Sequence, residues 1–351
     1  MILSEIGERQ IIESLRQKIK GSTKNLVGLI DDAAILDVGS NEYLVVTIDR
    51  IPFPYGLKCG IGGYKDLGKY FACTVIIDVI AKGAKPFAFL QALGLPSTMY
   101  IEDLEQLVDG VNQIANKYGI DIIGGDTKEK DDADLVGVCI GWTMRKKYFP
   151  RDAAKVGDVV AVTGPLGLFS AYMYLATTEE GAKISEKIRE TIRIKYVSHI
   201  DIPYAVMERI RDLDSCNASA DISDGLLGEV HRIAKYSNVG VRLYVDQIFV
   251  PDELRELSNM LGKHPYYFPL CVGGDLQIVL TINPKKWKVI SDKLREENLK
   301  LYPIGEIIAK EGVYLSNSCD KEIVEPVEWE YFRNLSYKDL FRKVDRLLSN
   351  P

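Results

Sequence analysis

Residues 66–95 read DLGKYFACTVIIDVIAKGAKPFAFLQALGL, and this stretch decides the fold. Its first part, residues 66–82, carries apolar side chains at three- and four-residue spacing, which predicts an amphipathic helix. Its last part, residues 86–95, is an apolar run of strand length and predicts a β-strand. Asp78 falls on the inward face of the predicted helix. Because an unpaired carboxylate in apolar surroundings is costly, Asp78 either pairs with a neighbouring element or belongs to a site.

Helix and strand patterns alternate on both sides of this stretch, which is typical of an α/β or α+β protein. The polar, proline-containing segment 147–156 separates two groups of elements, so we expect two domains, 1–147 and 148–351, in keeping with a length of 351 residues. The first group comprises predicted strands at 43–49, 86–95, 120–123 and 135–142 and helices at 66–82 and 102–118. The second comprises strands at 159–163, 241–245 and 278–282, helices at 225–237 and 285–297, and a charged helical or looped segment at 181–203.

The composition excludes several classes of protein. A net charge of −6 argues against a nucleic-acid-binding protein, which usually carries a basic patch. The six cysteines are scattered without a C-x-x-C pair, which favours reduced thiols in a cytoplasmic protein over a zinc ribbon. The N-terminal segment lacks the apolar core of a signal peptide, and no apolar run approaches the length of a membrane span. We therefore expect a cytoplasmic protein that binds neither nucleic acid nor membranes.

Common catalytic motifs are absent from the sequence. There is no G-x-x-x-x-G-K-[ST] loop and no G-x-S-x-G elbow, so neither a P-loop nucleotidase nor a triad hydrolase is supported. Gly60-Ile61-Gly62-Gly63 lacks the third glycine and the preceding strand of a dinucleotide-binding fingerprint, and is interpreted as a flexible turn. His199, His231 and His264 show no metal-ligand spacing and are interpreted as ordinary surface or helix residues.

Six aspartates lie in or beside apolar runs where carboxylates are unexpected: Asp32, Asp49, Asp78, Asp126, Asp221 and Asp224. If they converge, they form a site for hard divalent cations and therefore for a polyphosphate nucleotide. Gly124-Gly125 before Asp126 lets the backbone approach a phosphate closely. Gly225 after Asp224 precedes a predicted helix, whose N-terminus with Ser223 suits an anion. Capping of that helix by Asp224 or Ser223 explains the same pattern equally well.

Nine segments, in collinear order over nearly the whole chain, carry a resemblance to a known family. They are Asp31–Ala34, Thr47–Asp49, Asp78–Pro86, Gly124–Thr127, Arg151–Asp158, Thr163–Gly167, Asp221–Leu226, Gly273–Asp275 and Glu328–Phe332. The chain is similar to the thiamine-monophosphate kinase branch of the aminoimidazole-ribonucleotide synthetase superfamily. The resemblance implies a two-domain α/β (α+β) fold, with a ferredoxin-like N-terminal domain that pairs in a homodimer across a shared sheet and an α/β C-terminal domain that closes over the nucleotide.

The resemblance also implies residue roles. The six aspartates would hold several magnesium ions around ATP, Gly125, Asp126, Arg151 and Ser223 would contact the nucleotide, and Asp275 and Trp329 would bind the acceptor. An equally good interpretation is that Trp329 fills a space in the hydrophobic core near the C-terminus. The implied reaction is direct transfer of the ATP γ-phosphoryl group to an acceptor phosphate oxygen, which requires charge neutralisation and in-line positioning more than a strong base.

The departures from the family pattern lie mostly on the acceptor side. In the family's Gly-Gly-Glu-Asp motif, the shorter Asp275 replaces the glutamate and Leu276 replaces the acid that follows it. Residues 51–56 replace a Gly-x-His-Phe segment, and Ile48 replaces a hydroxyl residue. Two further differences are Ile30 in place of glycine and Lys128-Glu129-Lys130 in place of an arginine. This pattern fits a paralogue with a changed acceptor.

The expected function is a magnesium-dependent ATP phosphotransferase that forms thiamine diphosphate and ADP from thiamine monophosphate and ATP. Three alternatives stay open: a kinase of a nucleoside-like alcohol such as α-ribazole, an ATP-dependent synthetase of the aminoimidazole-ribonucleotide type, and a nucleotide-binding protein without catalysis.

Overall fold

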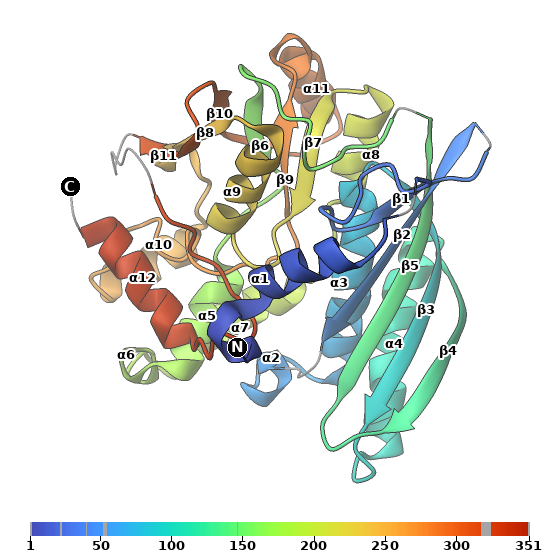
Figure 1. Ribbon diagram of the computed structural model, residues 1–351. Helices are drawn as coiled ribbons and strands as arrows, with labels where there is room; N and C mark the ends of the chain where they lie inside the picture. The colour runs from blue at the N-terminus through green and yellow to red at the C-terminus, as the bar shows by residue number, and fades with distance from the viewer. Residues whose placement is uncertain are drawn as a thin grey trace.

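The computed structural model describes residues 2–21, 23–39, 41–51, 55–145, 147–316 and 324–349. Two β-sheets with their helices lie side by side (Figure 1). The elements of the first half are α1 (Leu3–Lys18), β1 (Ala34–Asp37), β2 (Glu42–Ile51), α2 (Tyr55–Lys58), α3 (Tyr64–Ala81), β3 (Lys85–Leu95), α4 (Ile101–Tyr118), β4 (Asp121–Glu129) and β5 (Asp134–Met144).

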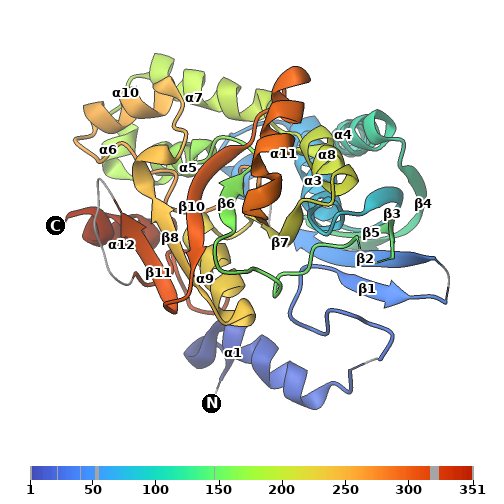
Figure 2. The same cartoon turned by 90° about the horizontal axis from the view of Figure 1, so that it is seen from above.

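The first sheet has the strand order β1-β2-β5-β3-β4, in which β3 and β4 are parallel and all other neighbours antiparallel. Helices α3 and α4 cover one of its faces (Figure 2), which is the layering expected of the N-terminal domain. The predicted helix 66–82 is confirmed as α3. The predicted strand 120–123 was too short, because β4 continues its pairing with β3 through the two glycines to Glu129.

The second sheet has six strands in the order β11-β8-β10-β6-β9-β7. Its elements are β6 (Val159–Val162), α5 (Leu168–Thr177), α6 (Glu179–Ala182), α7 (Glu186–Ser198), α8 (Tyr204–Asp212), β7 (Cys216–Asp221), α9 (Leu226–Ser237), β8 (Gly240–Tyr244), a 3-10 turn (Val245–Gln247), α10 (Asp252–Met260), β9 (Ile278–Ile282), α11 (Pro284–Glu296), β10 (Tyr302–Ile308), β11 (Gly312–Ser316) and α12 (Tyr337–Ser349). The expected two-part α/β fold is confirmed, whereas the boundary at residue 147 stays a prediction.

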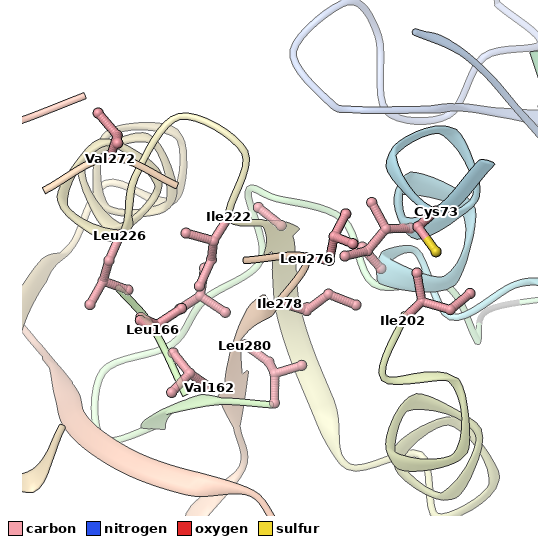
Figure 3. Packing of buried hydrophobic residues seen from close by; sticks show 14 of the residues in the cluster. Cys73, Val162, Leu166, Ile202, Ile222, Leu226, Val272, Leu276, Ile278 and Leu280 are labelled. Carbon is pink, nitrogen blue, oxygen red and sulfur yellow. The ribbon is translucent and has the colours of Figure 1, made fainter. Parts of the chain in front are cut away.

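One hydrophobic core runs through both halves. Figure 3 shows Leu276 and Ile278 of the second half close to Cys73 of α3 and to Ile202. All four side chains are buried. The two sheets are therefore joined by apolar packing that brings α3 against the second half. No helix among the described residues is long and apolar enough to cross a membrane.

The face of the first sheet that α3 and α4 leave uncovered is apolar. Along β5, buried residues alternate with the half-exposed Val136, Val138, Ile140 and Trp142. On neighbouring β2, the Ile48 side chain is 70% exposed. Alternation puts these residues on one face of the sheet, opposite the helices. A contiguous apolar sheet face of this kind usually marks an interaction surface.

The segment 7–9 of α1 is held against the far end of the chain. The backbone N–H of Glu8 donates to the carbonyl of Tyr331 at 3.1 Å, and Arg9 forms an ion pair with Glu328. Gly7 has φ +75°, and a Cβ there would lie 2.5 Å from Oε1 of Glu330. The left-handed conformation favours glycine, and a larger residue would also have to displace the Glu330 and Arg333 side chains. The first helix is thus fastened to the second half of the molecule.

Helices α3 and α4 cross at two facing glycines, Gly68 and Gly110. A Cβ at position 110 would overlap the carbonyl oxygen of Lys65 and lie 2.8 Å from the backbone nitrogen of Lys69. We predict that Gly110→Ala destabilises the protein by about 1–3 kcal/mol, the usual range for overpacking, which outweighs the gain of about 1 kcal/mol in helix propensity. Urea denaturation measures the change. Gly21→Ala is the control, since a Cβ there meets open space, and equal midpoints for both variants would contradict the crossing.

Candidate functional site

A cavity of about 520 Å³ lies between the two halves. Segments far apart in the chain form its wall, including α1, β2, α3, α5, α7 and the turns at 223–224 and 272–274. Its aromatic lining consists of Tyr70, Phe169, Tyr196, Trp329, Tyr331 and Tyr337. Its acidic lining consists of Glu8, Asp49, Asp66 and Asp224. The cavity therefore combines an aromatic chamber with a carboxylate-rich edge.

Four of the predicted metal-ligating aspartates lie near one another at and behind that edge. Asp49 ends the buried face of β2, Asp78 lies on α3, and Asp221 and Asp224 flank the turn between β7 and α9. The hydroxyl of Thr47 donates to Asp78 Oδ2 at 2.8 Å and ties β2 to α3. Hence strand β2, helix α3 and the β7–α9 turn bring these carboxylates together.

Burial raises the pKa of every member of this group, and repulsion from nearby carboxylates adds to it. Burial, reinforced by Asp32, raises the pKa of Asp221 to about 7. Burial, reinforced by Asp224, raises that of Asp49 to about 6. The pKa of Asp78 lies well above its ordinary value for the same reasons, and that of Asp224 is also raised by burial. Among the described residues, only Asp224 of these four has a cationic side chain within ion-pair distance, Arg232 at 3.8 Å. Asp49, Asp78 and Asp221 have none, and a bound cation would relieve them.

Asp32 differs from these four because two buried cations contact it directly. Its Oδ2 lies 3.0 Å from the buried ammonium of Lys82, and its Oδ1 accepts from the guanidinium of Arg151. Burial would raise the pKa of Asp32, but Arg151 and Lys82 outweigh it and hold that pKa at about 2. Asp32 is therefore held ionised by two internal cations.

Lys82 and Arg151 also connect the two halves. The Lys82 ammonium pairs with Asp31 and donates to the carbonyl of Ser219 on β7 at 2.7 Å. Arg151 lies 3.3 Å from Glu229 of α9, and its backbone N–H donates to Asp31 Oδ2 at 2.9 Å. The predicted nucleotide contact by Arg151 remains a prediction, because its guanidinium is engaged with acids here.

A second row of ion pairs continues from this network to the end of the chain. Arg232 contacts Glu229 on the same helix and Glu328 at 2.9 Å, while Glu328 also pairs with Arg9 of α1. Sequence reasoning missed Lys82, Glu229 and these arginines. The spacing of Glu229 and Arg232 was the one available signal, because residues three apart on a helix are neighbours.

Two predicted residues, Gly125 and Asp126, lie apart from the carboxylate group. Strand pairing places Asp49, Gly137, Gln91 and Gly125 in one row across β2, β5, β3 and β4. Three interstrand spacings separate the ends of this row by about 14 Å. Thr47, two residues before Asp49, faces α3, whereas Asp126 follows Gly125 and so points to the uncovered face. Within one chain, Asp126 does not meet the other aspartates.

The predicted acceptor residues have different positions. Trp329 lines the cavity, and its ring centroid lies 4.9 Å from that of Tyr337. Asp275 instead accepts backbone hydrogen bonds from Gly167 at 2.7 Å and Phe169 at 2.9 Å at the start of α5. It lies beside the cavity floor, next to the lining residue Gly274. Ser223 also lines the cavity, close to the N-terminus of α9. Residues 52–54 of the altered acceptor segment fall outside the described residues.

The carboxylate group fits hard cations chemically, because it offers only oxygen donors whose raised pKa values mark missing positive charge. In the described part of the chain, however, no three His, Cys, Asp or Glu side chains are already arranged to hold a metal ion. The magnesium ligand set therefore stays a prediction, with Asp49, Asp78, Asp221 and Asp224 as its compact part.

Comparison with known proteins identifies the family. Residues 30–143 match the N-terminal domain of AIR synthase related proteins, and residues 155–316 match the C-terminal domain. The chain belongs to the AIR synthase related family. It is 32% identical over 331 residues to a thiamine-monophosphate kinase of Pyrococcus horikoshii. The aligned region covers 93% of this chain and 98% of the kinase.

Further relatives show how broad the family is. A putative hydrogenase expression/formation protein of Methanocaldococcus jannaschii is 26% identical, covering 84% of this chain and 85% of its own. The solved structure of AaThiL complexed with AMPPCP and TMP superimposes with a TM-score of 0.79 at 25% identity, covering 94% of this chain and 99% of that one. These matches confirm the expected family and place the chain among ATP-using enzymes.

The raised pKa values predict how the metal-free protein responds to pH. A carboxyl group whose pKa is higher in the folded than in the unfolded state stabilises the fold most below its unfolded pKa, and this stabilisation is lost as pH rises through the folded value. Asp49 and Asp221 titrate near 6 and 7 when folded. In EDTA, the melting temperature should fall by a few degrees between pH 5 and pH 8, since about 1 kcal/mol corresponds to roughly 2–4 °C.

The variant Asp221→Asn should flatten this decrease, and calorimetric melting curves at several pH values measure it. Asp212→Asn is the matched control, because Asp212 is exposed on α8. If Asp221→Asn kept the wild-type pH slope, the carboxylates would not be the source of the instability.

Proposed function

We propose that this protein is a magnesium-dependent ATP phosphotransferase whose acceptor binds in the aromatic cavity. One observation carries the proposal: Asp49 and Asp224 line a cavity that also contains Trp329 and Ser223, and the buried Asp78 and Asp221, whose pKa values are also raised, add to the same acidic group. The likeness to thiamine-monophosphate kinases over nearly the whole chain supports thiamine monophosphate as the acceptor. The products would then be thiamine diphosphate and ADP.

In the proposed reaction, an oxygen of the acceptor phosphate attacks the γ-phosphorus of ATP. The bond between that phosphorus and the β–γ bridging oxygen breaks, and its electron pair leaves with ADP. Asp49, Asp78, Asp221 and Asp224 would hold the magnesium ions, which supply the charge neutralisation that phosphoryl transfer requires. The aromatic wall orients the acceptor and excludes water, while the N-terminal end of α9 offers backbone N–H groups to an anionic oxygen. No side chain needs to act as a strong base, because a phosphate oxygen is already ionised.

A second acceptor class is favoured by one observation. Among the described lining residues, Arg50 is the only base, and Asp134 already binds it through two hydrogen bonds of 2.7 Å. The chamber therefore offers little positive charge of its own to an acceptor phosphate. A nucleoside-like alcohol such as α-ribazole is the second candidate, because it places no phosphate in the chamber.

We further propose a homodimer formed through the uncovered face of the first sheet. Its apolar side chains need a partner surface, and β4 at the sheet edge carries Asp126 on that face. Asp126 is three strands away from Asp49 within one chain. In the proposed dimer, Asp126 of one copy would instead contribute to the nucleotide site of the other copy. The N-terminal half would then supply both dimerisation and metal binding, and the C-terminal half would close the site.

Turnover tests the proposed reaction. With magnesium and ATP, ADP release should require thiamine monophosphate or, for the second candidate, α-ribazole. Asp224→Asn should lower magnesium-dependent ATP binding at least tenfold because it removes a charged ligand, with the melting temperature retained. Asp252→Asn, an exposed residue of α10, should behave as wild type. ATP binding without turnover on either acceptor would favour a nucleotide-binding protein, and unchanged binding in Asp224→Asn would contradict the site.

Mixing experiments test the shared site. Val138→Asp should convert the dimer to monomers in light scattering, because it buries a charge in an apolar contact, whereas Ile194→Asp on α7 should not. Asp126→Asn and Asp224→Asn are each expected to be inactive. Co-refolded together, they should recover about a quarter of wild-type activity, since half of the randomly formed dimers carry one intact site. No recovery would show that Asp126 acts within its own chain or not at all.

A further inference from the structure

Glu8 is an acidic residue of the cavity wall that neither the metal group nor the acceptor prediction includes. It lies on α1 and is half-buried where the first helix meets the C-terminal segment. The backbone N–H of Tyr331 donates to its Oε2 at 3.3 Å, and no cation is recorded within ion-pair distance among the described residues. By contrast, the neighbouring Arg9 is engaged by Glu328. Glu8 therefore presents an uncompensated negative charge to the chamber.

The position of Glu8 is fixed by contacts that its neighbours make with the C-terminal segment. Gly7 directly before it adopts a left-handed conformation, with Glu330 and Arg333 occupying the space a side chain would need. The backbone N–H groups of Glu8 and Arg9 donate to Tyr331 and Glu330 respectively. Three consecutive residues of the first helix are thus fixed on the C-terminal segment. This fixing turns the carboxylate of Glu8 toward the cavity that Trp329 and Tyr331 also line.

The other acids of the chamber have compensation or another role. Asp66 pairs with Lys69 at 2.6 Å, and Asp49 and Asp224 belong to the metal group. Glu8 stands among the aromatic side chains, whose faces attract cations. A carboxylate beside aromatic rings, with no basic partner, is suited to a ring that carries positive charge or N–H donors. The same charge repels an anionic ring and gives no advantage to a neutral ring.

We propose that Glu8 is an acceptor-recognition residue that selects a positively charged or N–H-bearing heteroaromatic ring. This inference rests on the proposed function, because it assigns the cavity to the acceptor. It adds a specificity contact from the N-terminal helix on the ring side of the acceptor, away from the transferred phosphoryl group. Burial, with Asp224 and Glu330 nearby, raises the pKa of Glu8 and indicates that positive charge is missing beside it.

Calorimetric binding without turnover tests the proposal. The probes are thiamine, whose thiazolium ring is positively charged, and 5-(2-hydroxyethyl)-4-methylthiazole, which is neutral. Glu8→Gln retains an acceptor for the Tyr331 N–H and removes only the charge. It should weaken thiamine binding about tenfold or more, the usual loss for a charge-assisted contact, while binding of the neutral probe stays within about twofold. Glu8→Asp should recover part of the loss. Glu13→Gln, on the exposed side of α1, should match the wild type.

Other outcomes overturn the proposal. Equal weakening of both probes, unchanged thiamine binding, or no thiamine binding by the wild type would remove Glu8 from acceptor recognition. A loss of magnesium or ATP affinity in Glu8→Gln would assign it to the metal group instead. Because the readout is binding, a protein that fails to transfer phosphate to any acceptor still gives a result for Glu8.

Discussion

The buried ammonium of Lys82 is the interaction on which the site depends. It follows α3 directly, neutralises Asp31 and Asp32 and donates to the carbonyl of Ser219 on β7. Leaving the two carboxylates buried without this charge would cost about 3–5 kcal/mol. The ammonium therefore fixes the loop before β1 against both sheets. It also separates Asp31 and Asp32, which contact this buried cation, from Asp49, Asp78, Asp221 and Asp224, which do not.

This division explains which parts of the site could be predicted from sequence. Carboxylates in apolar runs are visible in one dimension. Asp49, Asp78, Asp221 and Asp224 influence one another electrostatically in the structure, whereas their convergence on a metal ion stays a prediction. The counter-charges of Asp32 are not visible, because Lys82 and Arg151 become neighbours only when α3 and the segment after β5 fold together. Sequence reasoning thus grouped Asp32 with the others, although its pKa is shifted in the opposite direction.

The fold was predicted more completely than the site. Helix α3 and its neighbours follow from apolar periodicity, which depends on local spacing alone. Strand β4 was predicted too short because glycines usually end a strand, yet pairing with β3 carries it onward. The place of Asp126 depends on the order β2-β5-β3-β4, which no local pattern encodes. Glu8 was missed for a related reason, because the contact that positions it is with Tyr331, which is 323 positions away in the sequence.

The fastening of α1 to residues 328–333 has a consequence for biosynthesis. A ribosome that has made both sheets has still not supplied Trp329, Tyr331 or the partner of Arg9. The cavity wall is closed last, when the C-terminal segment meets the helix that was made first. A chain that stops early would keep most of its core but lack the chamber. The chamber wall therefore forms only after residues 328–333 have been made and have met α1.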